Sequence, residues 1–193
     1  MKKLLLVVVA VMCFSCLANE KSIFNIKAIR VEEGVKWVGH GTAWAVDSSK
    51  LGYNDGFYII SSGHVVDYRK EFQVHIDGEW RNCELIKHSI EKDKDCALLK
   101  VDYKDEKNEI PKIKLKEDVN TILMFDHEKG KVQSKEKVTP RYLYIKATVK
   151  SGNSGGPVLD RDGEAIGIIW GYTDFGETGI IIPTATLIEV LKK

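Results

Sequence analysis

The segment Ser151-Gly152-Asn153-Ser154-Gly155-Gly156-Pro157 places a serine among three glycines. Glycine adopts backbone angles that other residues avoid, so a tight turn here can project the Ser154 hydroxyl while neighbouring N–H groups converge on one point. The segment therefore predicts a nucleophilic serine beside an oxyanion-binding turn, although a purely structural glycine-rich turn would have the same composition.

The order of residues along the chain separates two enzyme folds that use such a serine. The segment also fits Gly-x-Ser-x-Gly, the pattern of α/β-hydrolases, which place their histidine after the serine and a helix after the turn. Here residues 157–160 have the pattern of a strand, and every histidine precedes Ser154: His40, His64, His75, His88 and His127. The α/β-hydrolase fold is therefore excluded.

Short apolar runs separated by turn residues continue from Lys21 onward, and almost none has helical periodicity. This pattern is typical of β-barrels or sandwiches and not of alternating β and α layers. At the carboxyl end, Pro183, a capping Thr184 or Thr186 and an apolar stripe predict a helix. The predicted strands are residues 42–46, 57–61, 72–76, 80–87, 97–101, 121–125, 143–147, 157–159, 165–170 and 178–182.

Composition limits the partners of this chain. It has 193 residues and a formal net charge of +1, and its basic and acidic residues are interleaved, so no nucleic-acid surface is expected. The most polar internal stretch, residues 102–111, is interpreted as a linker between two β units, residues 19–105 and 106–193.

The amino end has the pattern of a secretory signal peptide, residues 1–18. Lys2 and Lys3 precede an apolar run over residues 4–14, which is shorter than the roughly 20 residues of a membrane-spanning helix. We therefore expect a secreted or periplasmic protein with no transmembrane span in its mature chain. An alternative makes Cys16 a lipid-anchored first residue at the membrane surface, because Ser15 is acceptable before it.

Past the signal, two cysteines remain, Cys83 and Cys96. If the segments around them form one hairpin turning near Glu91, Cys83 faces the neighbourhood of Val101, and Cys96 lies nearer His88 on the opposite face. Two buried free thiols are therefore favoured over a disulfide. Metal-ligand spacing is absent from the sequence, so no metal and no cofactor is predicted.

A serine nucleophile needs a histidine base that is itself held by a carboxylate. His64 follows an apolar run and the small residues 61–63, so it would emerge at the end of a strand. Asp95 directly precedes the apolar residues 96–99, which predicts a buried carboxylate. Ser154, His64 and Asp95 together form the predicted catalytic triad.

Four blocks of the sequence resemble the chymotrypsin-like (trypsin-like) serine proteases, most closely the bacterial HtrA-type and short secreted members. They are residues 39–44, 61–66, 95–101 and 152–157, the last three carrying histidine, aspartate and serine in that order. The resemblance implies an all-β fold of two packed antiparallel β-barrels with a C-terminal helix. It also implies a serine endopeptidase that hydrolyses protein or peptide substrates, with the N–H groups of Gly152 and Ser154 as oxyanion hole.

The same resemblance implies the residues that contact the substrate: Thr148, Ile169, Trp170, Gly171 and Gly179. Trp170 and Gly171 match the strand that pairs with the substrate backbone. Because Thr148 carries no charge, the expected preference is a small or medium apolar side chain. Ile169 replaces a hydroxyl that often supports the aspartate, which would leave Asp95 with one supporting group fewer than in chymotrypsin itself. The alternative function is a catalytically inactive binding or adhesion protein with the protease fold.

Overall fold

The computed structural model of the chain describes residues 20–67, 70–105, 110–116, 123–124, 132–133, 143–146, 149–160, 162–173 and 178–193. The predicted signal peptide, residues 1–18, and Thr148 lie outside the described residues, as does most of the predicted strand 121–125. None of the helices within the described ranges is long and apolar enough to cross a membrane.

The first unit is a closed barrel in which neighbouring strands follow the order β1-β2-β3-β6-β5-β4, all antiparallel. Alternating apolar residues fill its interior, as in β4, where Phe72, Val74 and Ile76 are buried between more exposed polar neighbours. The strands are β1 (Ile23–Glu32), β2 (Val35–Ala45), β3 (Phe57–Ser61), β4 (Glu71–Ile76), β5 (Glu79–Ser89) and β6 (Cys96–Val101).

Two strands of this barrel are buried on both faces. In β3 all five residues are buried, and in β6 only Lys100 is partly exposed. One face of each strand lines the barrel interior, and the other packs against the second unit through residues such as Ile60 and Leu98. This double burial explains their nearly continuous apolar sequence.

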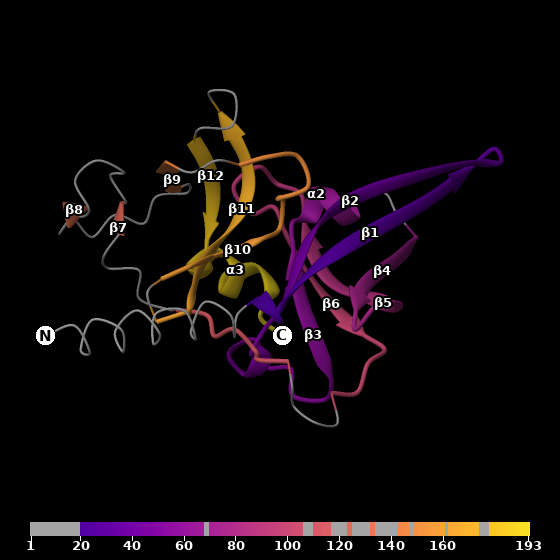
Figure 1. Cartoon of the computed structure of the whole chain (residues 1–193), viewed down its shortest axis with the longest axis horizontal. Helices are drawn as coiled ribbons and strands as arrows, with labels where there is room; N and C mark the ends of the chain where they lie inside the picture. The colour runs from indigo at the N-terminus through magenta and orange to yellow at the C-terminus, as the bar shows by residue number, and fades with distance from the viewer. Residues whose placement is uncertain are drawn as a thin grey trace, which may run out of the picture.

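The second unit contains a four-stranded antiparallel sheet in the order β10-β11-β12-β9. A separate pair, β7 with β8, lies outside this sheet. Figure 1 shows the two units side by side, with α3 where they meet. The strands are β7 (Leu123–Met124), β8 (Val132–Gln133), β9 (Leu143–Lys146), β10 (Pro157–Leu159), β11 (Ala165–Thr173) and β12 (Thr178–Pro183).

Three short helices complete the described structure: η1 (Ser48–Leu51), α2 (Gly63–Val66) and α3 (Thr184–Leu191). The predicted terminal helix is therefore present, and it begins directly after Pro183. Thr184 does not cap it, because its hydroxyl donates to the carbonyl of Lys116 at 2.7 Å. Leu187 and Leu191 bury the inner face of α3 in the core between the two units.

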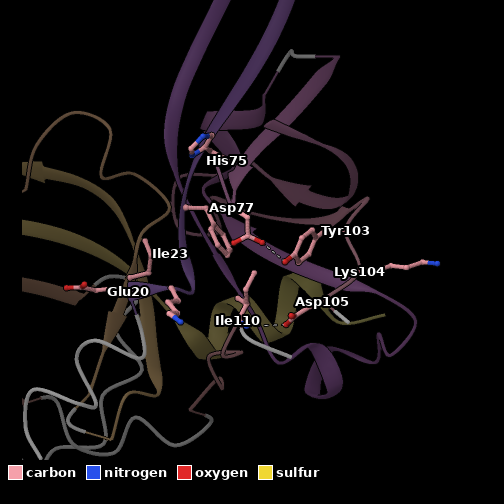
Figure 2. Close-up of a pocket in the computed structure, with 10 residues that line it drawn as sticks. Glu20, Ile23, His75, Asp77, Tyr103, Lys104, Asp105 and Ile110 are labelled. Carbon is pink, nitrogen blue, oxygen red and sulfur yellow. Dashed lines mark hydrogen bonds between the residues drawn. The ribbon is translucent and has the colours of Figure 1, made fainter. Parts of the chain in front are cut away.

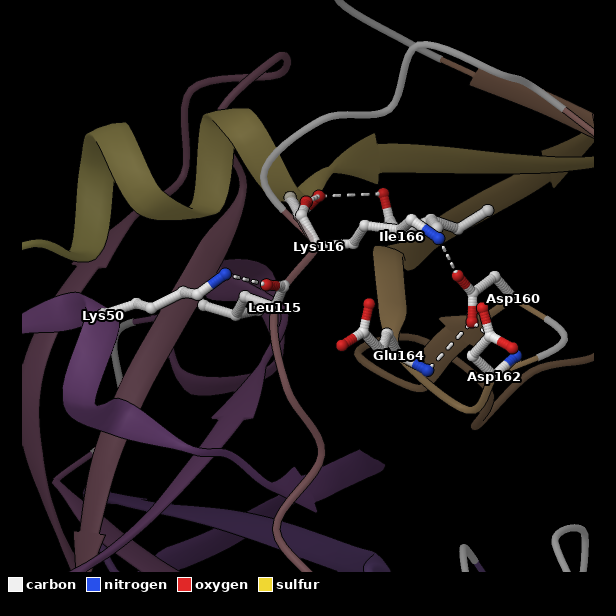
Figure 3. Close-up of polar contacts among 8 residues, drawn as sticks. Lys50, Leu115, Lys116, Asp160, Asp162, Glu164 and Ile166 are labelled. Carbon is white, nitrogen blue, oxygen red and sulfur yellow. Dashed lines mark hydrogen bonds and ion pairs between the residues drawn. The ribbon is translucent and has the colours of Figure 1, made fainter.

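The segment 110–116 joins the two units and hydrogen-bonds to both. Ile113 forms a parallel bridge with Val46, the residue that follows β2 of the barrel, and Leu115 forms a parallel bridge with Ala165 of β11. Figure 3 shows how side chains reinforce this connection: Lys50 donates to the Leu115 carbonyl at 2.8 Å, and Lys116 pairs with Asp160. The predicted boundary between residues 105 and 106 stays a prediction.

Most predicted strands are confirmed, but the strand β1 and the outer half of β2 were missed. The outer parts of these two strands form a hairpin that extends away from the barrel (Figure 1), where Val31 and Trp37 are exposed. The inner half of β1 does alternate, since Phe24, Ile26 and Ala28 are buried in the barrel core, and the prediction overlooked this signal. The outer part of the hairpin has no buried face to impose such a pattern.

The cysteine hairpin follows the predicted register at Cys83, which pairs with Val101. A register shift between Leu85 and Lys87 then moves Cys96 opposite Ser89, one residue from the predicted neighbour His88. Both thiols are free, with Cys96 buried and Cys83 partly buried.

Candidate active site

His64 lies at the point where β3 ends and the single turn of α2 begins. The glycine directly before it is required by space, because a Cβ added to Gly63 would lie 1.9 Å from the Ser89 carbonyl oxygen and 3.0 Å from Oδ1 of Asp95. Any other residue at position 63 would collide with the segment that carries the predicted aspartate. The imidazole itself is exposed, and its side chain is 43% accessible.

Asp95 holds His64 by two contacts. Its Oδ1 accepts the backbone N–H of His64 at 2.8 Å, and its Oδ2 lies 2.8 Å from Nδ1 of the imidazole. Asp95 is 3% exposed, so water does not compete for these contacts. Because an ionised carboxylate only accepts hydrogen bonds, Nδ1 carries the proton and Nε2 is left as the proton acceptor. The structure thus brings His64 and Asp95 together as predicted.

The serine segment forms the expected tight turn. Gly152 and Gly155 have φ of 93° and 87°, a left-handed region that side chains disfavour. The turn is closed by the Asn153 N–H, which donates to the Lys150 carbonyl at 3.0 Å, while the Asn153 side chain accepts the Lys150 N–H at 2.8 Å. Asn153 therefore stabilises the turn that carries Ser154.

This turn is anchored to the barrel beside the histidine. Thr42 of β2 donates its N–H to the Ser154 carbonyl at 2.9 Å and its hydroxyl to the Gly152 carbonyl at 2.7 Å. A Cβ added to Gly41 would lie 2.7 Å from Val65, the neighbour of His64, and 3.1 Å from the Ser154 carbonyl oxygen. The serine turn and α2 therefore meet at β2.

Within the described part of the chain, the Ser154 hydroxyl makes no hydrogen bond to His64. In the absence of substrate such catalytic hydrogen bonds are often long. Among the described residues, the N–H groups of Gly152 and Ser154 also donate to no partner, whereas those of Asn153, Gly155 and Gly156 do. Two N–H groups of the turn thus remain available to a ligand oxygen, and they are the two predicted for the oxyanion hole.

Asp95 accepts a third hydrogen bond, which the sequence did not predict. Nε1 of Trp170 donates to Oδ2 of Asp95 at 2.8 Å. The expectation that Asp95 lacks one supporting group because Ile169 carries no hydroxyl is therefore wrong. The donor comes from the next residue, and the sequence carried no signal for it, because the direction of the Trp170 side chain depends on the pairing of β11.

The remaining residues predicted to contact substrate lie on β11 and β12. The N–H of Ile169 donates to the Gly156 carbonyl at 2.9 Å, and its carbonyl accepts the N–H of Gly155 at 2.8 Å. Gly171 pairs with Ile180, and Gly179 pairs with Tyr172 of β11 on one side and Ile145 of β9 on the other. The strand β11 therefore hydrogen-bonds to the serine turn through Ile169, and its next residues, Trp170 and Gly171, are those predicted to pair with the substrate.

A separate cavity of about 570 Å³ is lined by none of these residues (Figure 2). Its walls include Phe24, His75, Asp77, Tyr103 and Ile110. The hydrogen bond from Tyr103 to Asp77, 2.7 Å long, is the main cause that raises the pKa of the phenol to about 12. The phenol therefore stays neutral, and the cavity holds none of the three predicted catalytic residues.

In the described ranges, no cluster of His, Cys, Asp and Glu suited to a metal ion is found.

Comparison with known proteins identifies similar sequences. The model of the trypsin-like peptidase domain matches residues 41–168. Two relatives named "Probable periplasmic serine endoprotease DegP-like", from Pseudomonas savastanoi pv. phaseolicola (strain 1448A / Race 6) and Pseudomonas putida (strain W619), are 31% and 32% identical over 58% and 60% of this chain. The chain spans only 26% of the length of each relative.

Solved structures resemble the chain in fold. The Rv3671c protease from M. tuberculosis in its active form has a TM-score of 0.61 at 19% identity, covering 92% of this chain and 82% of its own. The inactive form of the Rv3671c protease has a TM-score of 0.59 at 17% identity, covering 92% and 90%.

The solved structures share the fold of this chain and the two relatives are named serine endoproteases, in agreement with the resemblance to chymotrypsin-like serine proteases. Because the domain model matches more than half of its residues, the chain belongs to the trypsin-like peptidase family.

Proposed function

We propose that this chain is a secreted or periplasmic serine endopeptidase that hydrolyses protein substrates through His64, Asp95 and Ser154. The observation that carries the proposal is the buried Asp95 carboxylate bound to Nδ1 of His64 at 2.8 Å, next to a serine turn anchored on β2. A structural glycine-rich turn alone would not require a buried carboxylate paired with an exposed imidazole.

Each group has a defined role in this reaction. Ser154 attacks the scissile carbonyl as Nε2 of His64 takes its proton, and the imidazolium that forms is stabilised by Asp95. The N–H groups of Gly152 and Ser154 bind the oxyanion, a contribution of about 3 kcal/mol for a single donor in comparable enzymes. His64 then gives the proton to the leaving amine, and water hydrolyses the acyl-enzyme by the same steps in reverse.

The substrate groove follows β11. We propose that Thr148, Ile169, Trp170, Gly171 and Gly179 contact the peptide, and that the pocket favours a small or apolar side chain before the cut. The neutral side chain of Thr148 supports this preference. The resemblance also supports a second β-barrel over residues 106–193, to which the four-stranded sheet belongs.

The proposed location rests on the amino end. A signal peptide over residues 1–18 would release a protein that begins at Asn19, and the names of the two DegP-like relatives include the word periplasmic. A lipid anchor on Cys16 is the alternative. Mass spectrometry of the exported protein distinguishes a free Asn19 terminus from an acylated Cys16 terminus.

The activity is tested with the purified protein and its Ser154→Ala variant. The native protein should react with a fluorophosphonate probe and cleave an unfolded protein substrate, and peptide sequencing of the products defines the pocket preference. The variant should fold equally well and lose at least about 1000-fold in kcat, because no other group supplies the nucleophile.

A folded native protein that neither reacts with the probe nor cleaves any peptide would overturn the proposal. That outcome would instead support the inactive binding or adhesion protein.

A further inference from the structure

The strand β11 contains a bulge at Trp170. Ile169 pairs with Ile181 of β12 and Gly171 pairs with the next residue, Ile180, so β11 has one extra residue, Trp170, between these two pairs. An extra residue of this kind bends a strand and redirects a side chain. Without the bulge, side chains of consecutive residues would simply alternate between the two faces of the sheet.

The redirected side chain reaches the catalytic carboxylate. Nε1 of Trp170 lies 2.8 Å from Oδ2 of Asp95, the same oxygen that lies 2.8 Å from Nδ1 of His64. With Oδ1 bound to the backbone N–H of His64, both oxygens of the carboxylate are held. Because Asp95 is buried, the loss of one donor would leave a lone pair that water does not easily satisfy.

Ile169, the residue before Trp170, is hydrogen-bonded to the segment that carries Ser154 and to the segment that carries His64. The carbonyl of Ile169 accepts the Gly155 N–H at 2.8 Å and the Ser62 hydroxyl at 3.1 Å. Gly155 adjoins Ser154, and Ser62 precedes Gly63 and His64. The Lys92 ammonium lies 5.9 Å from the centre of the Trp170 ring, which adds a cation–π contact on the indole. The indole is therefore held in place relative to the serine and the histidine.

We propose that Trp170 is a positioning residue that orients Asp95, and through Asp95 the His64 imidazole, in place of the hydroxyl that Ile169 lacks. The proposal rests on the proposed function, since it needs His64 and Asp95 to be catalytic. It gives Trp170 a role in the rate of the chemical step that is distinct from contact with substrate.

The test is Trp170→Phe, which keeps an aromatic ring and removes the N–H donor. Trp37→Phe is the matched control, because Trp37 is exposed on the β1–β2 hairpin. Loss of one hydrogen bond to a charged group should lower kcat and the rate of fluorophosphonate labelling about tenfold or more, with KM within about twofold. The control should leave both values unchanged.

A second pair of variants tests whether Trp170 acts through Asp95. In an Asp95→Ala background, Trp170→Phe should lower the residual labelling rate no further, because the acceptor is gone. An equal loss in both backgrounds, or a raised KM with kcat unchanged, would overturn the positioning role. A native protein that fails to react with the probe defeats the proposed function instead, so the two failures are distinguishable.

A measurement on the native protein keeps the test valid if Trp170→Phe folds poorly. The chain has four tryptophans, whose indole N–H groups are observable by NMR. The Trp170 signal should exchange with deuterium at least tenfold more slowly than that of Trp37, and Asp95→Ala should abolish this protection. Exchange of Trp170 as fast as that of Trp37 would show that the hydrogen bond is not made.

Discussion

At the scale of single residues, burial decides which side chains are reactive. Asp95 is buried but held by hydrogen bonds from His64 and Trp170. The adjacent Cys96 is also buried, and desolvation together with the negative Asp95 raises the pKa of its thiol. The thiol beside Asp95 therefore stays neutral and does not compete with Ser154, the proposed nucleophile.

The second thiol provides a test by pH. Burial raises the pKa of Cys83 to about 12, so the folded protein keeps this proton while the unfolded chain releases it above about pH 9. The free energy of unfolding should therefore fall as the pH rises from 9 towards 12. Urea unfolding at pH 8 and pH 10 should give a decrease that is about 1 kcal/mol smaller in Cys83→Ala than in the native protein. An equal decrease in both would contradict the burial of this thiol.

At the scale of the elements, β6 contributes buried side chains to two hydrophobic cores. Leu99 lies in the barrel core and Leu98 in the core between the units, and both are fully buried. The β1–β2 hairpin is the opposite case, since the outer part of the hairpin has exposed apolar residues such as Val31. A strand therefore contributes to stability according to what covers its faces.

This difference predicts the effect of truncating apolar side chains. Leu99→Ala should lower the free energy of unfolding by about 2–5 kcal/mol, because it removes packed methyl groups and leaves a cavity. Val31→Ala should change it by less than about 0.5 kcal/mol, because Val31 is 58% exposed. Urea unfolding of the two variants measures both values, and similar losses would show that the hairpin is covered in solution.

At the scale of the whole molecule, the proposed active site depends on contact between the two units. His64 and Asp95 come from the barrel, while Ser154 and Trp170 come from the second unit. The core between the units joins barrel residues such as Trp44 to Ile168 and Ile182 of the second sheet, and α3 closes it with Leu187 and Leu191. Loosening this core should disturb the catalytic geometry.

Leu187→Ala tests this dependence. The variant should lose about 2–5 kcal/mol of stability, and its activity should disappear over the same urea range as its tryptophan fluorescence signal. Glu189→Ala on the exposed face of α3 is the matched control and should cost less than about 1 kcal/mol, since its pair with Lys94 is exposed. Activity that outlasts the unfolding of the inter-unit core would contradict the dependence.

The sequence by itself determined the β class and the terminal helix, because apolar periodicity and local turn chemistry are properties of short segments. It also predicted the pairing of His64 with Asp95, from the base and carboxylate that a serine nucleophile requires and from the resemblance of the four blocks to serine proteases. Tertiary structure alone decided the projecting outer part of the β1–β2 hairpin, whose apolar residues are exposed, and the third donor to Asp95. The direction of the Trp170 indole depends on a bulge in β11, and a bulge is set by how two strands align, which no local pattern encodes.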